Sequence, residues 1–265
     1  MLDKLLPDAV LSIFDFSDDF VELVRRQEDK KFYFHNMTKY ARAADIVLTV
    51  NEHLKNKYGF LNKNIHVLKN ATNYSNFDRT KFAPITFFEN IKGKGQPIIG
   101  YTGWINRTRI DFGLLDFLVE RRPEWQFVFI GPADDFFIER YSQYENIHII
   151  PPVDYKELPD YINYFDVAIV PFQINEHTKG NDLLKFHDYL AMGKPIVSTK
   201  IGGAEDLKHV IGIAQRPSEF LEEIEKSLTN KTYADISKRK NVALKNSWHN
   251  RIKELEILIE NAIGR

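Results

Sequence analysis

Four cationic residues lie where two helices are expected to begin, and they are the strongest chemical signal in the sequence. Lys179 and Lys185 lie in and just after a polar loop, and Arg107 and Arg109 lie in an earlier loop. The first turn of a helix presents unpaired N–H groups and partial positive charge, so cations there are unfavourable without a counter-ion. A phosphate would relieve that cost. The pattern therefore predicts a phosphorylated ligand.

Both loops are expected at one edge of a β-sheet. In the common doubly wound order 3-2-1-4-5-6 the sheet reverses between its first and fourth strands, and ligands bind there at the carboxyl ends. With this order, residues 102–109 and 172–181 line the crevice. Gly103 permits close approach of the backbone to a ligand. Thr108 and Asp111 have capping-box spacing, which predicts that a helix starts at Thr108.

A carboxylate and two turns fall at the same edge. Asp188 follows Lys185 by three residues, so it could hold ribose hydroxyls or form an ion pair with that lysine. Gly131 ends one expected strand, and Pro152 and Val153 follow another. These turns could form an apolar slot for a nucleotide base, or they could be ordinary turn chemistry.

Apolar runs that read as buried parallel strands alternate with helical segments, which indicates the α/β class. Three short runs occupy the first part of the chain, where the Gly-rich opening turn of a doubly wound domain is absent. Six further runs form a complete set. The expected strands are 9–14, 45–50, 65–68, 97–101, 126–130, 147–150, 166–170, 195–198 and 210–213.

These runs predict four parts in the chain. Residues 1–77 form a partial N-terminal, acceptor-side α/β domain, and residues 78–96 form a linker with Gly and Pro. Residues 97–230 form a complete Rossmann-like, doubly wound domain that binds the ligand. Residues 231–265 form a helix that crosses back to the first domain, since apolar residues from Trp248 onward repeat at helical spacing.

Composition restricts the classes to which the chain can belong. It has 265 residues, a net charge of −1 and no cysteine. The charge gives no sign of nucleic-acid binding, and the lack of cysteine excludes disulfides and thiolate metal sites. No apolar run reaches the roughly 18 residues of a membrane span, and the acidic start does not fit a signal peptide. We therefore expect a cytoplasmic protein.

With the strands placed, several motifs resemble nucleotide-sugar glycosyltransferases of the GT-B fold, in the group 1, family 4-like branch. The most specific motif is Lys-Phe-His-Asp-Tyr-Leu-Ala-Met-Gly-Lys-Pro-Ile-Val-Ser-Thr at 185–199. Residues 99–103, 123–132 and 158–162 are similar to other donor-domain motifs, and residues 42–52 are similar to that family's interdomain edge.

The resemblance implies transfer of a sugar from a nucleotide diphosphate donor, with UDP or GDP as the nucleotide and no further cofactor. It implies a glycan or lipid-linked acceptor in cell-surface polysaccharide or lipopolysaccharide synthesis. By position, Asp188 would bind the ribose. The donor diphosphate would meet Gly103, Arg107, Arg109, Asn181, Leu183 and Lys185, and the base would border Gly131, Pro152, Val153 and Leu158.

Two departures from the family pattern leave the catalytic residues open. Many retaining members carry two glutamates eight positions apart, where this chain has Gly180 and Asp188. The sugar-side carboxylate is therefore missing, and Glu176, His177 and His35 are the candidates for catalysis. The first strands of the N-terminal domain are also missing, so the chain is expected to be an incomplete piece of a longer enzyme or a degenerate copy.

The densest acidic group contains Asp15, Asp18 and Asp19. It is similar to the Asp-x-Asp of metal-dependent transferases, but it falls in the wrong domain to meet the donor. We interpret it as a solvated loop and predict no metal site.

Three alternatives to a transferase were weighed. A nucleotide-sugar epimerase needs paired carboxylates and a histidine in both domains, which we do not find. A degenerate domain that binds nucleotide or a partner protein without catalysis stays open. A dinucleotide-dependent oxidoreductase is rejected, because no Gly-x-Gly-x-x-Gly follows the strand at 97–101.

Two further contacts are considered. A truncated first domain exposes apolar sheet surface, which predicts a homodimer that covers it. The aromatic and basic run at 33–42 could face an acceptor or the inner membrane surface, giving a membrane-peripheral protein, or it could be a helix with one solvated face.

Overall fold

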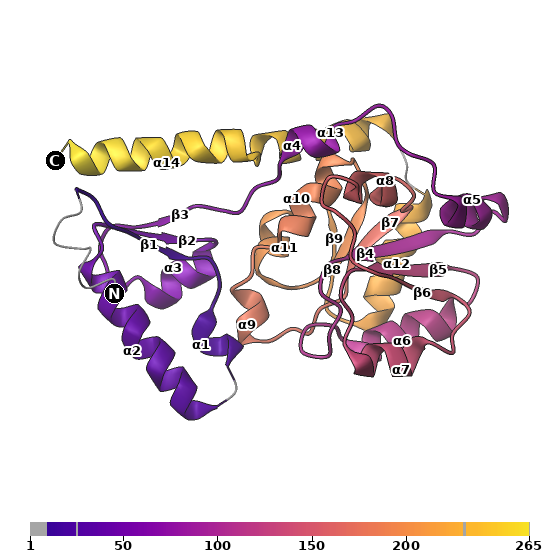
Figure 1. Ribbon diagram of the computed structural model, residues 1–265, viewed down its shortest axis with the longest axis horizontal. Helices are drawn as coiled ribbons and strands as arrows, with labels where there is room; N and C mark the ends of the chain where they lie inside the picture. Colours follow the sequence, from indigo (N-terminus) through magenta and orange to yellow (C-terminus); the bar gives the residue numbers. More distant parts are fainter. Residues whose placement is uncertain (1–9, 25, 230–231, 265) are drawn as a thin grey trace.

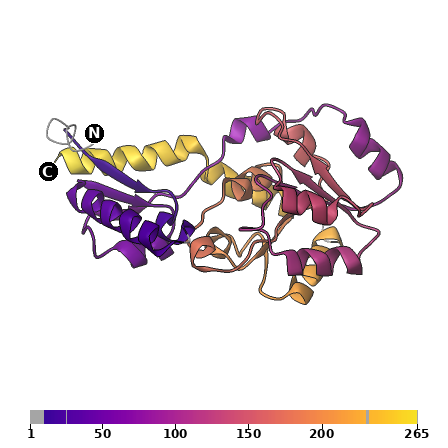
Figure 2. The same ribbon diagram turned by 60° about the horizontal axis from the view of Figure 1, so that its bottom comes forward.

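The chain folds around two parallel β-sheets that lie side by side (Figure 1). The computed structural model describes residues 10–24, 26–229 and 232–264. A view turned by 60° shows the same two lobes, with the last helix running along the smaller one (Figure 2). All pairings between the named strands are parallel, so the α/β class is confirmed.

The smaller lobe contains β1 (Ile13–Phe16), α1 (Phe20–Leu23), α2 (Gln27–Ala43), β2 (Ile46–Thr49), α3 (Glu52–Tyr58) and β3 (Ile65–Val67). The strands lie in the order β1-β2-β3, and every residue of β2 is buried. Parallel neighbours need crossover connections, which helices supply here. Phe16, Val47, Leu54 and Tyr58 pack in the core of this lobe.

The first strand differs from the predicted one. The run 9–14 predicts a strand, whereas β1 extends to Phe16, and residue 9 lies outside the described part of the chain. The ring of Phe16 is buried and stacks on Tyr58, whereas Val10 is exposed. Burial of this ring therefore decides which residues pair with β2.

The larger lobe contains β4 (Ile98–Thr102), α6 (Phe112–Arg121), β5 (Gln126–Ile130), α7 (Asp135–Tyr141), β6 (Ile147–Ile150), α8 (Leu158–Ile162), β7 (Val167–Val170), α9 (Glu176–Lys179), α10 (Leu184–Ala191), β8 (Ile196–Thr199), α11 (Gly202–Asp206), β9 (Gly212–Ala214) and α12 (Pro217–Thr229). Its strands lie in the order β6-β5-β4-β7-β8-β9. In chain order this is 3-2-1-4-5-6, so the predicted order is confirmed. The four inner strands are buried at every position, as expected when helices cover both faces.

Residues 78–96, predicted as a linker, contain a packed helix. The segment follows α4 (Tyr74–Phe77) and includes α5 (Thr86–Gly93). Phe88 and Ile91 of α5 are buried in the core of the larger lobe. The Gly and Pro residues that suggest a linker flank this helix. The segment therefore contributes to the packing of the larger lobe.

The chain passes between the lobes twice, near Thr72 and again in the tail, and the two connections lie side by side. The tail forms two helices, α13 (Tyr233–Lys245), which packs on α10, and α14 (Trp248–Ile263), which runs along the smaller lobe (Figure 1). Between them, the Thr72 N–H donates to the Asn246 carbonyl, and the Trp248 N–H donates to the Thr72 carbonyl, both at 3.1 Å. The two connections between the lobes are thus hydrogen-bonded to each other.

Candidate functional site

A cavity of about 280 Å³ lies at the carboxyl ends of β4, β5 and β6, beside the start of α10. The sheet reverses its strand order between β4 and β7, and crevices at such points bind ligands. All four residues of the predicted base slot line it, namely Gly131, Pro152, Val153 and Leu158. Gly103, Lys185 and Asp188 line it too. The structure therefore brings together seven of the residues that the sequence assigns to the donor.

The two glycines let the backbone of the crevice loops come close together. Gly103 has φ of 118° and Gly131 has φ of 139°, conformations that favour glycine. The Gly103 N–H donates to the Ile130 carbonyl at 2.8 Å. A Cβ atom on Gly131 would collide with the Gly103 carbonyl group. Larger residues at either position would push the loops apart and reshape the cavity.

Lys185 directs its ammonium group beneath the first crevice loop. Its Nζ donates to the Tyr101 hydroxyl at 2.8 Å and lies 4.1 Å from the centre of the Tyr101 ring and 4.9 Å from that of Phe172. Burial lowers the pKa of the Lys185 ammonium well below its usual value, and Arg109 lowers it further. An anion in the cavity would offset both effects, because it favours the charged form.

The prediction that a helix starts at Thr108 is wrong. Helix α6 begins at Phe112, and Asp111 is its N-cap, accepting from the Leu114 N–H at 3.1 Å. Thr108 belongs instead to a turn in which Asn106 Oδ1 accepts from the Thr108 N–H at 3.0 Å. Asp111 is the better-placed cap because its carboxylate reaches the first free N–H groups of the helix.

The two arginines of this loop are placed differently. Arg107 is exposed and lies over the ring of Phe136, and Arg109 is half-buried and lies over the ring of Trp104. Neither lines the cavity, but Arg109 is close enough to depress the pKa of Lys185. Arg109 therefore adds positive potential on the Lys185 side of the cavity.

Asp188 is buried and binds two hydroxyl groups. Its Oδ1 accepts from Thr72 Oγ1 at 2.7 Å and from the Tyr155 hydroxyl at 3.1 Å. Burial raises the pKa of the Asp188 carboxyl to about 6, although both hydroxyls oppose the rise. These hydrogen bonds, rather than the alternative ion pair with Lys185, hold the carboxylate. Both hydrogen bonds go to the same carboxylate oxygen, Oδ1.

Asn181 and Leu183, predicted near the diphosphate, precede α10 and do not line the cavity. The Asn181 amide donates to Asp18 Oδ1 at 2.9 Å, so it points to the smaller lobe. Leu183 packs against the core of the larger lobe. It is the N-cap residue of α10 without a side-chain cap bond, so N–H groups of the first turn stay open to a ligand.

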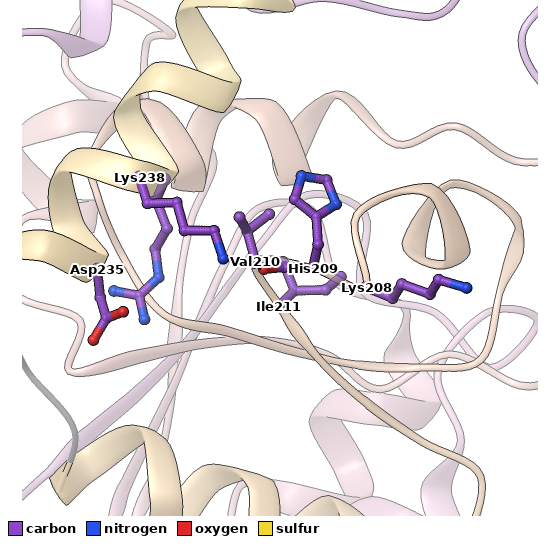
Figure 3. Close-up of a pocket in the computed structure, with 7 residues that line it drawn as sticks. Lys208, His209, Val210, Ile211, Asp235 and Lys238 are labelled. Atoms are coloured by element: carbon purple, nitrogen blue, oxygen red, sulfur yellow. Dashed lines mark hydrogen bonds between the residues drawn. The ribbon is translucent and has the colours of Figure 1, made fainter.

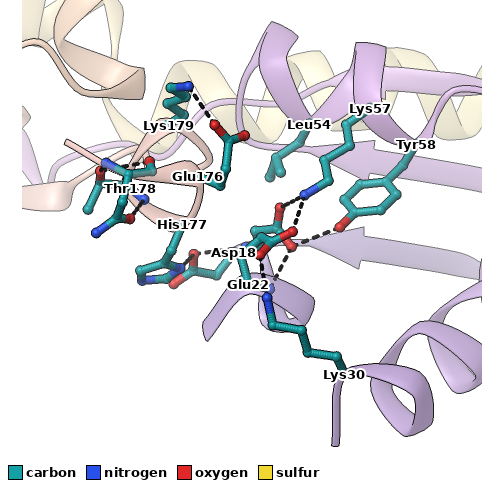
Figure 4. Close-up of polar contacts among 12 residues, drawn as sticks. Asp18, Glu22, Lys30, Leu54, Lys57, Tyr58, Glu176, His177, Thr178 and Lys179 are labelled. Carbon is teal, nitrogen blue, oxygen red and sulfur yellow. Dashed lines mark hydrogen bonds and ion pairs between the residues drawn. The ribbon is translucent and has the colours of Figure 1, made fainter. Parts of the chain in front are cut away.

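The three candidates for catalysis have different surroundings. Glu176 forms an exposed ion pair with Lys179 at 2.6 Å (Figure 4). His35 is exposed on α2, which lies on the side of the smaller sheet opposite α14 (Figure 1). His177 alone is buried between the lobes, where its Nδ1 lies 3.5 Å from Asp18 Oδ1.

Asp18 is a residue that sequence reasoning missed. The acidic group does lie in the smaller lobe, but the prediction of a simply solvated loop is wrong, because Asp18 contacts both His177 and Asn181 of the larger lobe. The contact with Asn181 joins residues 163 positions apart. No local spacing encodes such a contact.

Gly180 stands where the family pattern has a glutamate, and the smaller lobe covers it. A Cβ atom there would lie 3.1 Å from Asp19 Cβ and 3.1 Å from Leu54 Cδ2. Because such contacts are tight, neighbouring side chains of the smaller lobe would have to shift to admit a side chain at this position.

Several other cavities lie away from this crevice. One, of about 180 Å³, lies between residues 208–211 and α13 (Figure 3). Lys238 at its wall donates to the His209 carbonyl at 2.8 Å. Another, of about 480 Å³, lies between the lobes, beside the starts of α3 and α11.

Two features are absent from the described ranges 10–24, 26–229 and 232–264. No group of three or more His, Cys, Asp or Glu side chains there could hold a metal ion. No helix in those ranges is long and apolar enough to cross a bilayer.

Comparison with known protein families shows to which family the chain with this crevice belongs. The sequence profile of the family described as Glycosyl transferases group 1 matches residues 96–230, just over half of the 265 residues. The chain belongs to the group 1 glycosyl transferases. The matched segment contains the whole six-stranded sheet and every residue that lines the crevice cavity.

A curated relative of this group 1 glycosyl transferase is TuaH of Bacillus subtilis (strain 168), whose name places it in teichuronic acid biosynthesis as a glycosyltransferase. The two are 26% identical over 197 residues, which is 70% of this chain and 48% of TuaH. The chain thus spans about half the length of this relative.

Solved structures of similar fold confirm the GT-B architecture. HepE of Anabaena, solved with UDP-glucose, has a TM-score of 0.72 at 12% identity, covering 96% of this chain and 72% of HepE. Sucrose-phosphate synthase from Thermosynechococcus elongatus has a TM-score of 0.73 at 14% identity, covering 95% of this chain and 68% of that enzyme. At these identities the likeness establishes the fold.

Proposed function

We propose that this protein transfers a sugar from a nucleotide diphosphate donor to a glycan or lipid-linked acceptor in cell-surface polysaccharide or lipopolysaccharide synthesis. The environment of Lys185 carries the proposal. Its ammonium is held by a phenol and two aromatic rings, beside Arg109, in the wall of a cavity at the sheet reversal. A diphosphate is the ligand that would compensate two neighbouring cations.

The proposed mechanism uses the positive charges of Lys185 and Arg109. In sugar transfer the bond between the anomeric carbon and the diphosphate breaks, and its electron pair moves to the diphosphate oxygen. Lys185, Arg109 and the N-terminal turn of α10 would stabilise that charge, as fixed donors do in a site with little water. Asp188 would hold the ribose, and Gly131, Pro152, Val153 and Leu158 would border the base.

UDP is the nucleotide we favour, with GDP as the alternative. The support is that HepE was solved with UDP and with UDP-glucose. The relation to TuaH supports a cell-surface polysaccharide as the product.

Calorimetric titration with UDP, GDP, ADP and CMP tests the proposal. We expect micromolar binding of one diphosphate, lost by at least tenfold in Lys185→Ala. Lys226→Ala is the matched control, since Lys226 is an exposed lysine paired with Glu223 on α12. If no nucleotide binds, or if both variants bind as well as wild type, the donor site is wrongly assigned.

A second candidate is a domain that binds nucleotide or a partner without transferring sugar. The glycine at 180, where the family pattern has the sugar-side glutamate, favours it, and the smaller lobe packs closely against this position. Binding of a diphosphate together with no cleavage of the sugar donor would select this candidate.

We also propose two contacts with other surfaces. Trp248, Ile252 and Ile263 on α14 are exposed, which supports a homodimer that covers them. Phe32 and Tyr33 are exposed on α2, which supports peripheral contact with the inner membrane from a cytoplasmic location. Sedimentation equilibrium and flotation with anionic vesicles test the two contacts separately.

A further inference from the structure

The cavity between α13 and the loop at 208–211 lies far from the donor crevice (Figure 3). Its loop leads directly into β9, and Arg239 in its α13 wall donates to the carbonyl of Gly193, in the turn that leads into β8. In a parallel sheet all strands begin at the same side. The cavity is therefore at the amino ends of the strands, whereas the donor crevice is at their carboxyl ends.

Arg239 is a half-buried cation whose hydrogen-bonding capacity is only partly used. Its Nη1 donates to the Gly193 carbonyl at 3.3 Å, which is a neutral acceptor. Its Nε is buried and has no hydrogen-bond partner among the described residues. Burial lowers the pKa of the Arg239 guanidinium, and the charge of Asp235 opposes that shift. Because buried donors without a partner are rare, the free Nε indicates a place for an acceptor.

Lys238 brings a second positive charge to the cavity. Figure 3 shows its side chain extending from α13 toward the loop, where its Nζ donates to the His209 carbonyl at 2.8 Å, again a neutral acceptor. Lys208 lies at the rim, and its side chain points away from α13 (Figure 3). The charged residues that line the cavity, apart from His209, are three cations and one carboxylate, namely Lys208, Lys238, Arg239 and Asp235. Three positive charges and one negative charge leave a net charge of +2.

Both walls of the cavity are fixed by packing. On one side α13 packs on α10, and Ile236 fits against Gly193, where an added Cβ atom would lie 2.7 Å from Ile236 Cγ2. On the other side Ile211 is buried in the core of the larger lobe, and Val210 packs against that core. The two cations are therefore carried by rigid elements, as a binding site requires.

The size and charge of the cavity restrict the ligand. Its volume is about 180 Å³, which is below the roughly 300–1,000 Å³ of pockets that hold drug-sized molecules. An arginine can bind a phosphate through two parallel hydrogen bonds from Nε and Nη2, and Arg239 uses Nη1 for Gly193. A phosphate monoester has close to two negative charges and three acceptor oxygens. This group matches both the small volume and the net charge.

We propose that this cavity binds a phosphate monoester group, with Arg239 as the main binding residue and Lys238 as the second. The phosphate oxygens would accept from the Nε edge of Arg239 and from Lys238 Nζ. A soluble sugar phosphate and the headgroup of phosphatidic acid both carry this group, and the experiment below separates these two sources. The site does not depend on the donor crevice or on sugar transfer.

Titration with inorganic phosphate, followed by NMR of the backbone amides, tests the site. Ionic strength is held constant with chloride, because screening would otherwise change during the titration. We expect saturable shifts of the amides of residues 208–211 and of α13. Arg239→Gln should weaken the fitted affinity about tenfold or more, and Lys238→Gln about threefold or more. Lys238 is exposed, so its variant should fold even if Arg239→Gln does not.

Two controls exclude a general effect of charge and binding in the donor crevice. Lys226→Gln removes an exposed lysine that is paired with Glu223 on α12, and its affinity should stay within about twofold of wild type. Lys185→Ala should keep the shifts at 208–211, because Lys185 lines the donor crevice. Shifts that disappear in Lys185→Ala and persist in Arg239→Gln would place the phosphate in the donor crevice and overturn the inference.

Glucose 6-phosphate in solution and vesicles of phosphatidylcholine with phosphatidic acid distinguish the sources of the phosphate. Shifts with the sugar phosphate that weaken in Arg239→Gln identify a soluble ligand. Flotation with the vesicles that falls in Arg239→Gln identifies a lipid headgroup, since flotation through the aromatic residues of α2 would not depend on Arg239. A response to inorganic phosphate alone identifies free phosphate. The inference is overturned if no phosphate compound shifts residues 208–211, or if Arg239→Gln and Lys238→Gln both bind phosphate as well as wild type.

Discussion

Replacing Asp188 by Asn should stabilise the protein above neutral pH and weaken binding of the nucleotide. The carboxyl is buried, and its pKa is raised from its ordinary 3.8 to about 6. An acid whose pKa is raised on folding contributes stability that is fully present below the unfolded pKa and lost as pH rises through the folded pKa. The difference of about 2 units corresponds to about 3 kcal/mol.

The structure indicates that asparagine can take the place of this carboxylate. Both hydrogen bonds, from Thr72 and Tyr155, go to Oδ1, and an amide oxygen can accept both, although more weakly than a carboxylate does. The amide nitrogen then occupies the place of Oδ2, without the desolvated charge. We therefore expect the free energy of unfolding of Asp188→Asn to exceed that of wild type by up to about 3 kcal/mol at pH 8.

The assay is urea denaturation of both proteins from pH 4 to pH 8. The quantity to compare is the free energy of unfolding of Asp188→Asn minus that of wild type, because the contributions of the other titrating groups are the same in both proteins. This difference should grow as pH rises from about 4 to 6 and level off above 7. Asp135→Asn, which removes an exposed carboxylate on α7, should show no such growth. A difference that is independent of pH, or that shrinks as pH rises, would refute the reasoning.

Three further predictions concern the same cavity. Gly103→Ala should lose about 1–2 kcal/mol of stability, since the φ of Gly103 is 118°. It should also lose most of the diphosphate affinity, since the new methyl group would stand 3.0 Å from Lys185 Nζ. Unchanged affinity by calorimetry would contradict this. Diphosphate binding should take up a proton and weaken as pH rises through the depressed pKa of Lys185. Calorimetry in buffers of different ionisation enthalpy would detect the proton, and equal heats would refute it. Thr72→Val should cost about 1–3 kcal/mol at pH 8, because the Asp188 carboxylate loses a hydroxyl partner. It should cost less in an Asp188→Asn background, because a neutral amide oxygen accepts a weaker hydrogen bond than a carboxylate; equal costs in both backgrounds would argue against a charged Asp188 at this pH.

The larger sheet was predictable because its four inner strands are buried at every position and its edge strands are apolar as well. Such strands read as unbroken apolar runs, and β5 and β6 lie where the sequence predicts them. The regular strand order then fixes which loops meet. For this reason Gly103, Lys185 and Asp188 could be grouped before their distances were known.

Local capping was less predictable, because several residues near a helix start can serve as caps. Thr108 and Asp111 both fit, and only packing of Ile110 and Phe112 selects Asp111. Helix α9 escaped notice because its capping box pairs Asn175 with Thr178 rather than with an acidic residue. Short polar helices give no apolar periodicity to detect.

Contacts between the lobes could not be predicted at all. Asp18 meets Asn181 and Thr72 meets Asp188 across 163 and 116 positions of sequence. Each side chain alone is compatible with a solvated loop or a turn. The predicted division into domains stays a prediction, although the hydrogen bonds around Thr72 show where the chain passes between lobes.

The path of α14 has a consequence for synthesis of the chain on the ribosome. Strands β1 to β3 leave the ribosome before the larger sheet, but the helix that runs along their sheet is made after all six strands of the larger sheet. The larger sheet can therefore form while the smaller one still waits for α14. During that interval Ile46 and Leu48 of β2, buried in the finished fold, would be exposed to chaperones. A translational pause just before Trp248 should lengthen this vulnerable period and increase aggregation.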